Sequence, residues 1–375
     1  MDFAYTEEQR MLADSLRRLV QDEWGFATRR ARATQVAMDA RAWAQLAELG
    51  VLGLNISAEY GGFGEPPASL LPVHLELGRG LVSEPVIPSA VMSAALLVAC
   101  ADVAVRQRWL PALATGQVIM TVAYQEPGRR YETDPSLCRL TSAGDTGLQL
   151  SGTKHLVWHG AAAHAWLVSV RDADNEPVLL RVPADSKRVT VVDTPTLDRA
   201  RCARLDFDRT PLASDAIVAR GERARDGLAM ALQWGVAALC AHAAGAMERL
   251  LEITIDYLKT RRQFGQPLAA FQVLQHRLAD MLVAKEMGLS MAYVAAAALS
   301  EPDEGRRSRM LASAKLEAAR AGRFVAQSAV QLHGGMGMTD ELEVGDYFKR
   351  LTMVDQLLGD SAEQLAVLET LAALE

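Results

Sequence analysis

Cysteine is scarce in this sequence, and none of it occurs in a metal-binding spacing. The four cysteines are scattered at Cys100, Cys138, Cys202 and Cys240, and no two of them form a C-x-x-C pair. This pattern argues against a disulfide framework and against a structural zinc site. We therefore expect four reduced, mostly buried thiols, as in an intracellular protein.

Long runs of positive charge and long apolar runs are also missing. The net charge is −7, and no basic run exceeds three residues, which argues against nucleic-acid binding. The first ten residues, MDFAYTEEQR, lack the apolar core of a signal peptide. The most apolar stretch, 87–105, contains Pro88 and Asp102 and falls short of the roughly 20 apolar residues of a spanning helix. We expect a cytoplasmic protein without membrane insertion.

The composition that remains is that of a large folded chain. Half of the 375 residues are apolar and 23% are charged, so a sizeable core can form, and the length predicts two or three domains. The pattern predicts an α+β fold with an N-terminal helical domain over 1–117, a middle antiparallel β-barrel or sandwich over 118–220, and a C-terminal four-helix bundle over 221–375.

Local signals support this order. Thr6 and Gln9 form a capping box, T-E-E-Q, before an apolar helical stripe. Small residues between Ala237 and Gly245 suit closely packed helices. Seven short runs with strand character, separated by turn residues, occupy the middle of the chain: 118–124, 148–150, 155–158, 166–170, 178–182, 189–192 and 203–207.

Three segments carry candidate chemistry. The first, K-T-R-R-Q-F-G-Q-P-L-A-A-F-Q-V-L-Q at 259–275, is either a basic helix end followed by a turn or a site for an anionic, planar ligand. The second, Q-L-H-G-G-M-G-M-T at 331–339, is either a helix end with a flexible turn or a loop whose backbone approaches a cofactor. The third, Y-Q-E-P-G-R-R-Y at 124–131, is either a turn that ends a strand or a loop lining a flavin and an acyl chain.

Together these segments resemble the acyl-CoA dehydrogenase family of flavoproteins. The resemblance covers nearly the whole chain and includes E-E-Q-R-M-L, E-Y-G-G-F-G, the E-P-G turn, S-G-T-K, R-R-Q-F-G-Q-P with F-Q-V-L-Q, and Q-L-H-G-G-M-G-M-T. The C-terminal D-Y-F-K-R-L-T-M makes the chain look most like the branch of pimeloyl-CoA dehydrogenase small subunits.

The resemblance implies FAD, α,β-desaturation of an acyl-CoA and electron transfer to an electron-transfer flavoprotein. A carboxylate of the enzyme removes the α-proton in this chemistry. The resemblance assigns the flavin ring to Tyr124, Gln125, Tyr131, Leu156, Val157 and Trp158. It assigns the rest of the FAD to a site shared between subunits, and hence implies an oligomer, with Arg261, Gln263, Phe264, Gln272, Gln331, Gly334 and Gly335. From position alone, Arg129 and Arg130 could hold a dicarboxylyl substrate.

The chain departs from the family pattern at the catalytic base. Many members carry a Glu where Leu358 stands, and others carry one where Gly235 stands; neither residue can accept a proton. Asp360 is the nearest replacement, although it could equally cap the helix that follows. Bulky Gln125, Tyr131 and Trp158 stand where small residues are usual.

Three functions are therefore compatible with the sequence. The chain is the subunit that lacks the base in a heteromeric acyl-CoA dehydrogenase, as in family branches that include steroid side-chain degraders. Alternatively, it is an active homo-oligomer that uses Asp360, or a non-enzymatic interaction protein that has lost its flavin.

Overall fold

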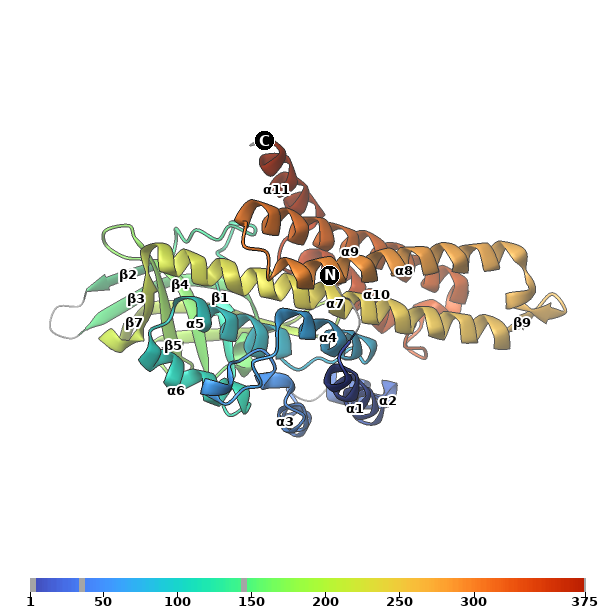
Figure 1. Ribbon diagram of the computed structural model, residues 1–375, viewed down its shortest axis with the longest axis horizontal. Helices are drawn as coiled ribbons and strands as arrows, with labels where there is room; N and C mark the ends of the chain where they lie inside the picture. The colour runs from blue at the N-terminus through green and yellow to red at the C-terminus, as the bar shows by residue number, and fades with distance from the viewer. Residues whose placement is uncertain (1–4, 34–37, 143–146, 374–375) are drawn as a thin grey trace. The chain divides into compact units, whose positions relative to one another are not determined.

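The computed structural model describes residues 5–33, 38–142 and 147–373, which form two compact units. The unit that we call the helical unit comprises Met1–Ala31, Pro67–Val82 and Val236–Glu375. The other, which we call the sheet unit, comprises Arg32–Pro66 and Ser83–Gly235. Along the chain, helices precede the strands and further helices follow them, as the predicted fold class requires (Figure 1). The predicted domain boundaries at residues 117 and 220 stay predictions.

The helices agree closely with the sequence pattern. Thr6 forms the predicted capping box with Gln9: the Gln9 N–H donates to the Thr6 hydroxyl at 3.2 Å, and the Thr6 N–H donates to the Gln9 side chain at 3.1 Å. The four helices predicted after residue 220 are α7 to α10, and α11 follows them. The α-helices are α1 (Glu7–Glu23), α2 (Phe26–Ala33), α3 (Ala40–Glu48), α4 (Leu70–Arg79), α5 (Ala94–Cys100), α6 (Val103–Ala114), α7 (Gly221–Thr260), α8 (Gln272–Ala298), α9 (Glu304–His333), α10 (Val344–Gln356) and α11 (Ser361–Ala373).

The sheet unit is built on an eight-stranded sheet in the order β6-β7-β3-β2-β4-β5-β8, with β1 paired to β4. Most neighbours are antiparallel, as predicted, whereas β1 and β2 each pair with β4 in parallel. The strands are β1 (Met120–Ala123), β2 (Arg139–Ser142), β3 (Leu148–Trp158), β4 (Ala165–Arg171), β5 (Pro177–Pro183), β6 (Val189–Pro195), β7 (Arg201–Leu212) and β8 (Ile217–Arg220). A separate two-stranded hairpin, β9 (Arg262–Gln263) with β10 (Gln266–Pro267), lies in the helical unit.

Strand β3 differs from its prediction. The runs 148–150 and 155–158 were expected to be separate strands, but one strand of 11 residues covers both. The polar stretch between the two runs contains Gly152, whose φ is +133°, and the pairing with β7 is irregular next to it. The same stretch contains the buried Lys154. A bulge at glycine and a buried charge both disguise a strand in the sequence.

The apolar stretch after residue 85 begins as a π-helix, Val86–Ser93, and continues as α5. Every residue of this π-helix is buried, which agrees with the predicted buried helix. Its Ser93 hydroxyl donates to the carbonyls of Pro88 and Met120, both at 2.9 Å, and so ties the π-helix to β1. The extra residue of a π-turn is thereby stabilised by side-chain hydrogen bonds inside the sheet unit.

Two described helices, α7 and α8, are long and apolar enough to cross a membrane by length and composition. The apolar window of α7 is 72% buried and that of α8 is 39% buried. The core helix of a soluble protein meets the same criterion, so this finding is weak evidence for a membrane span.

Close packing of α4 against α7 organises the helical unit. A Cβ added at Gly245 would lie 1.9 Å from the Leu75 carbonyl oxygen, and one at Gly78 would lie 2.0 Å from the His242 carbonyl oxygen. The two backbones therefore approach as closely as glycine allows, as the small residues of α7 predicted. In the same unit, α8 and α9 lie side by side (Figure 1).

Replacing Gly245 with Ala should therefore destabilise the protein. The methyl group cannot fit without moving α4 away from α7, and overpacking of this kind costs about 1–3 kcal/mol or more. Urea denaturation measures the change. Gly305→Ala in the first turn of α9 is the matched control, because a Cβ there meets its nearest atom at an ordinary 3.5 Å. We expect that control to be neutral or stabilising, and equal stability of both variants would contradict the packing argument.

Candidate functional site

The sheet unit brings together two of the segments that the resemblance assigns to a flavin. Tyr124 and Gln125 follow β1 and are buried, and the Gln125 side-chain amide donates to the Tyr124 hydroxyl at 3.1 Å. The backbone N–H of His155 in β3 donates to the Gln125 carbonyl at 3.0 Å. The loop after β1 and the end of β3 are thus neighbours, although about 30 residues separate them in the sequence.

The backbone at these segments is unusual. Leu156 has a φ of +50° and Tyr131 a φ of +55°, a region that residues with a Cβ rarely adopt. Leu156 is also 58% exposed, whereas Val157 is buried and Trp158 is half-buried. Strained backbone of this kind persists only where the surrounding structure enforces it, and it concentrates at functional sites.

An ion pair that we did not single out from the sequence lies at this junction. The Lys154 ammonium is 2.9 Å from the Glu126 carboxylate, and the two side chains are 0% and 2% exposed. Burial alone would raise the pKa of Glu126, but the Lys154 charge and backbone N–H groups lower it to about 2. The available signal was a lysine inside a strand together with the Glu of the E-P-G turn.

The two arginines proposed for a dicarboxylyl substrate lie in the exposed loop after this turn. Arg129 forms an ion pair with Glu132 at 3.1 Å, and the Arg130 guanidinium lies over the Tyr131 ring at 5.3 Å. Arg129 is therefore already neutralised by a neighbour on the same loop. A role of either arginine in substrate binding stays a prediction.

The second group of predicted residues lies in the helical unit, around the hairpin β9–β10. Arg261, Gln263 and Gln272 are exposed, and Phe264 at the hairpin turn is 88% exposed. Within the described residues, the Arg261 side chain makes no hydrogen bond or ion pair. A guanidinium and an aromatic ring at one exposed turn provide donors for an anion and a face for a planar group.

The glycine-rich segment after α9 lies at the same end of the helical unit. The Tyr257 ring, near the end of α7, stacks on the His333 ring at 4.2 Å, and the Tyr257 hydroxyl lies 3.4 Å from the His333 carbonyl oxygen. Because Arg261 follows Tyr257 by four residues, this contact places the hairpin next to the glycine segment. The structure therefore collects Arg261, Gln263, Phe264, Gln272, Gln331, Gly334 and Gly335 at one end of the bundle.

These residues fit the pyrophosphate and adenosine part of a dinucleotide. A Cβ at Gly334 or at Gly335 would meet no atom within 4 Å, so open space adjoins both backbones. The His333 side chain is buried, and its Nδ1 lies 2.8 Å from the Ala329 carbonyl oxygen. Its Nε2 is buried and has no partner among the described residues.

The turn between α10 and α11 contains the position of the expected base. Leu358 is half-buried with a φ of +59°, and Gly359 follows with a φ of +98°. The Asp360 carboxylate accepts the N–H of Glu363 at 3.0 Å at the start of α11. Asp360 therefore caps a helix, as its alternative reading predicted, and its catalytic role stays a prediction.

A buried lysine underlies this turn. The Lys315 ammonium on α9 donates to the carbonyls of Gly359 at 2.8 Å and Asp355 at 3.3 Å. Asp355 in turn forms an ion pair with Arg323 at 2.6 Å and accepts from the Ser361 hydroxyl at 2.6 Å. Burial lowers the pKa of Lys315 to about 8, although Asp355 and Asp360 favour its charged form. Lys315 and Asp355 thus fix the turn between α10 and α11 at both of its ends.

The acidic stripe on α7 has structural partners. Arg79 on α4 forms ion pairs with Glu248 and Glu252, each at 2.9 Å. The Glu248 and Glu252 side chains nevertheless stay 42% and 40% exposed, so this face of α7 also meets solvent. A long-range pairing between α4 and α7 has no local sequence signal.

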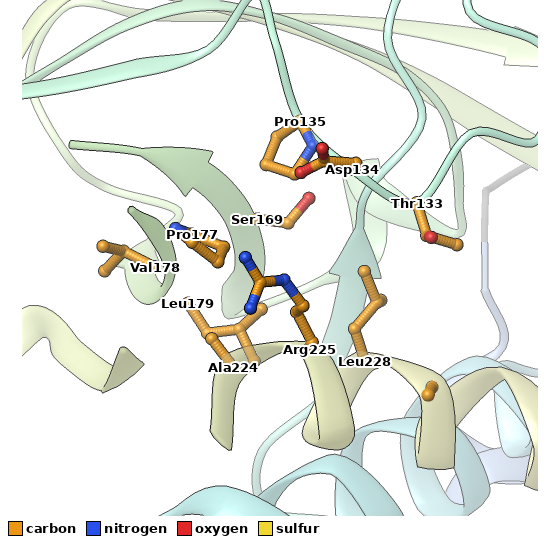
Figure 2. Close-up of a pocket in the computed structure, with 11 residues that line it drawn as sticks. Thr133, Asp134, Pro135, Ser169, Pro177, Val178, Leu179, Ala224, Arg225 and Leu228 are labelled. Atoms are coloured by element: carbon orange, nitrogen blue, oxygen red, sulfur yellow. The ribbon is translucent and has the colours of Figure 1, made fainter. Parts of the chain in front are cut away.

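A small cavity of about 180 Å³ lies in the sheet unit. Its walls are mainly apolar, and Leu179, Leu228 and Ser169 contribute to them; Ser169 also accepts from Lys154 at 3.2 Å. Figure 2 shows the side chain of Arg225, an exposed residue of α7, among the side chains that line the cavity. The sequence did not predict this cavity, because strands β4 and β5, a loop and α7 contribute to it together.

Known protein families match both ends of the chain. Residues 6–117 match the N-terminal domain of acyl-CoA dehydrogenases, and residues 227–369 match the C-terminal domain of the same enzymes. The chain belongs to the acyl-CoA dehydrogenase family. It is therefore a member of a family of oxidoreductases, and its α+β fold class is confirmed.

Individual relatives and structures extend the match over the whole chain. Acyl-CoA dehydrogenase IpdE2 of Mycobacterium tuberculosis is 31% identical over 368 residues, which is 97% of each protein. A structure of a variant of the Tcur3481-Tcur3483 steroid acyl-CoA dehydrogenase has a TM-score of 0.87 at 30% identity and covers 98% of both chains. The ChsE4-ChsE5 complex of Mycobacterium tuberculosis has a TM-score of 0.89 at 25% identity over 100% of both chains.

One relative is much longer than this chain. The (2S)-methylsuccinyl-CoA dehydrogenase of Cereibacter sphaeroides is 28% identical over 318 residues, and the match spans 57% of that protein's length.

The buried Lys315 should give the protein a measurable pH dependence of stability. Its pKa is about 8 in the folded chain and about 10.5 when unfolded, so the unfolded chain binds more protons between these values. This group therefore makes the free energy of unfolding rise with pH in that window. Between pH 7.5 and 9.5, the wild type should gain about 1–2 kcal/mol relative to Lys315→Met. Urea denaturation of both proteins across this range tests it, and parallel pH curves would contradict it.

Proposed function

We propose that this chain is a FAD-binding subunit of a heteromeric acyl-CoA dehydrogenase and that a second family member supplies the catalytic base. The observation that carries the proposal is the turn between α10 and α11, where Leu358 occupies the position that the resemblance assigns to the catalytic Glu. Its neighbour Asp360 already accepts a backbone N–H as a helix cap. The proposal therefore assigns Asp360 a structural role as a helix cap and leaves removal of the α-proton to the partner.

The comparisons support a two-protein enzyme. Both structures reported above are named for pairs of proteins, and one is named as a steroid acyl-CoA dehydrogenase. The likeness of the C-terminal sequence to pimeloyl-CoA dehydrogenase small subunits is consistent with the same arrangement. We propose a CoA thioester with a bulky acyl group, such as a steroid side chain, as the substrate class. An electron-transfer flavoprotein stays the predicted electron acceptor.

The residues of this chain have distinct roles in the proposal. Tyr124, Gln125, Tyr131 and Leu156–Trp158 line the flavin ring of the FAD that this chain binds. Arg261, beside the open backbone of Gly334 and Gly335, neutralises the pyrophosphate of the FAD in a neighbouring subunit. FAD, when bound, supplies the acceptor for the β-hydrogen of the thioester. The chain itself positions the cofactor and excludes water, and proton removal is left to its partner.

Restoring the missing carboxylate tests the proposal. In Leu358→Glu, the flavin of the chain alone should become reducible by an acyl-CoA, because a base then stands where the family places it. Anaerobic loss of the oxidised flavin band measures this. Leu358→Gln is the matched control, since it has the same size without basicity. Reduction in both variants to the same extent would contradict the assignment.

The second candidate is an active homo-oligomer with Asp360 as the base. It is favoured by the burial of Asp360 two residues beyond Leu358. Asp360→Asn separates the two roles, because Asn caps a helix about as well as Asp but cannot act as a base. Our proposal predicts that neither the wild type nor Asp360→Asn reduces its flavin when the chain alone is mixed with an acyl-CoA. It also predicts that the two proteins are equally stable. If the wild type alone reduces its flavin and the variant does not, the second candidate is correct.

A further inference from the structure

The carboxylate of Glu126 closes the loop that follows β1. Its Oε2 accepts the backbone N–H groups of Ser136 at 2.9 Å and Leu137 at 2.7 Å, and its Oε1 accepts that of Cys138 at 3.0 Å. One side chain thus binds three consecutive residues that lie ten to twelve positions later in the sequence. The exposed segment between them is thereby closed at its base.

The Lys154 ammonium fixes the other side of this junction. It donates to the Tyr124 carbonyl at 3.0 Å, to Glu126 Oε1 at 2.9 Å and to the Ser169 hydroxyl at 3.2 Å. All three donors of the ammonium are used, and the side chain has no exposure to water. The backbone of Tyr124 is therefore held directly by this lysine.

These contacts join the two flavin segments. Lys154 precedes Leu156 by two residues in β3, and the N–H of His155 between them donates to the Gln125 carbonyl. Consecutive residues 124, 125 and 126 are thus each bound to residue 154 or 155. The positive φ of Leu156 immediately after this junction has to be held by such contacts, because it is unfavourable on its own.

Stability alone does not explain a buried ion pair. Replacing such a pair with apolar residues of similar volume is often neutral or stabilising, because desolvation of the two charges offsets their attraction. What the pair supplies is a unique arrangement of the chain segments that it joins. At this junction, those segments are the ones expected to meet the cofactor.

We propose that Glu126 and Lys154 are positioning residues that set the geometry of the flavin pocket through Tyr124, Gln125 and Leu156. Neither residue touches the cofactor in this inference, which rests on the proposed FAD-binding function. The pair aligns the loop after β1 with the end of β3, so that both present a fixed surface to one face of a planar ring.

The test compares FAD binding with stability in the purified full chain. Lys154→Met alone leaves a buried, unpaired carboxylate and could prevent folding, so it is combined with Glu126→Gln to remove both charges. Glu126→Asp is the second variant; it keeps the charge but shortens the reach of the carboxylate. Asp208→Asn is the matched control, because Asp208 pairs with Arg188 on the surface of the same sheet. Fluorescence titration gives the Kd for FAD, visible absorption reports the flavin environment, and urea denaturation of the FAD-free chain reports folding.

The double variant and Glu126→Asp should each bind FAD at least tenfold more weakly than wild type and show a shifted flavin band. We expect both effects even in a variant that keeps the urea midpoint of the wild type. The Asp208→Asn control should match wild type in all three measurements. A folded Glu126 variant with wild-type Kd and an unchanged flavin band would overturn the positioning role. A wild-type chain that binds no FAD would instead overturn the proposed function itself, and the positioning role with it.

Discussion

The sheet unit depends on a lysine that has no contact with water. Lys154 gives up the hydration of its charge on folding, and it recovers that cost only because Glu126, the Tyr124 carbonyl and the Ser169 hydroxyl surround it. Those four groups come from the loop after β1 and from strands β3 and β4. A single charge therefore requires three separate parts of the unit to meet in one arrangement.

The helical unit is organised by a steric constraint and by a second buried lysine. Gly78 and Gly245 let α4 and α7 approach to backbone contact, and Arg79 then reaches the carboxylates of Glu248 and Glu252. Lys315 binds the carbonyl groups of the turn that carries Leu358. The turn thus keeps a defined backbone at the position that the resemblance assigns to the catalytic Glu. In our proposal, this chain retains the family scaffold while another chain performs the proton transfer.

The sequence predicted most helices well because their signals are local. Helix α8 of the predicted bundle spans Gln272–Ala298, and its apolar pattern and flanking turns define it without reference to other elements. Strand β3 was divided in two because the partner that makes Lys154 tolerable lies 28 residues away. Strands β2 and β8, of four residues each, were missed because such short runs carry little pattern.

The candidate site was likewise predictable where its signals are local and not where distant segments meet. Motifs located the segments around Tyr124, Arg261 and Gly334, but the sequence could not show which of them meet. The stacking of Tyr257 on His333 joins the last two, and the buried ion pair joins the first to the end of β3. The paired roles of Glu248 and Glu252 were likewise invisible, because Arg79 belongs to a helix far away in the sequence.

The most direct test of the account is an anaerobic visible spectrum of the wild-type chain with CoA thioesters. The flavin band should stay oxidised when the chain alone is mixed with straight-chain, dicarboxylyl or steroid CoA thioesters. It should bleach with one of them once a family member that carries the catalytic Glu, such as one encoded by a neighbouring gene, is added. Bleaching by the chain alone would contradict the central claim, because it would show that this chain contains its own base.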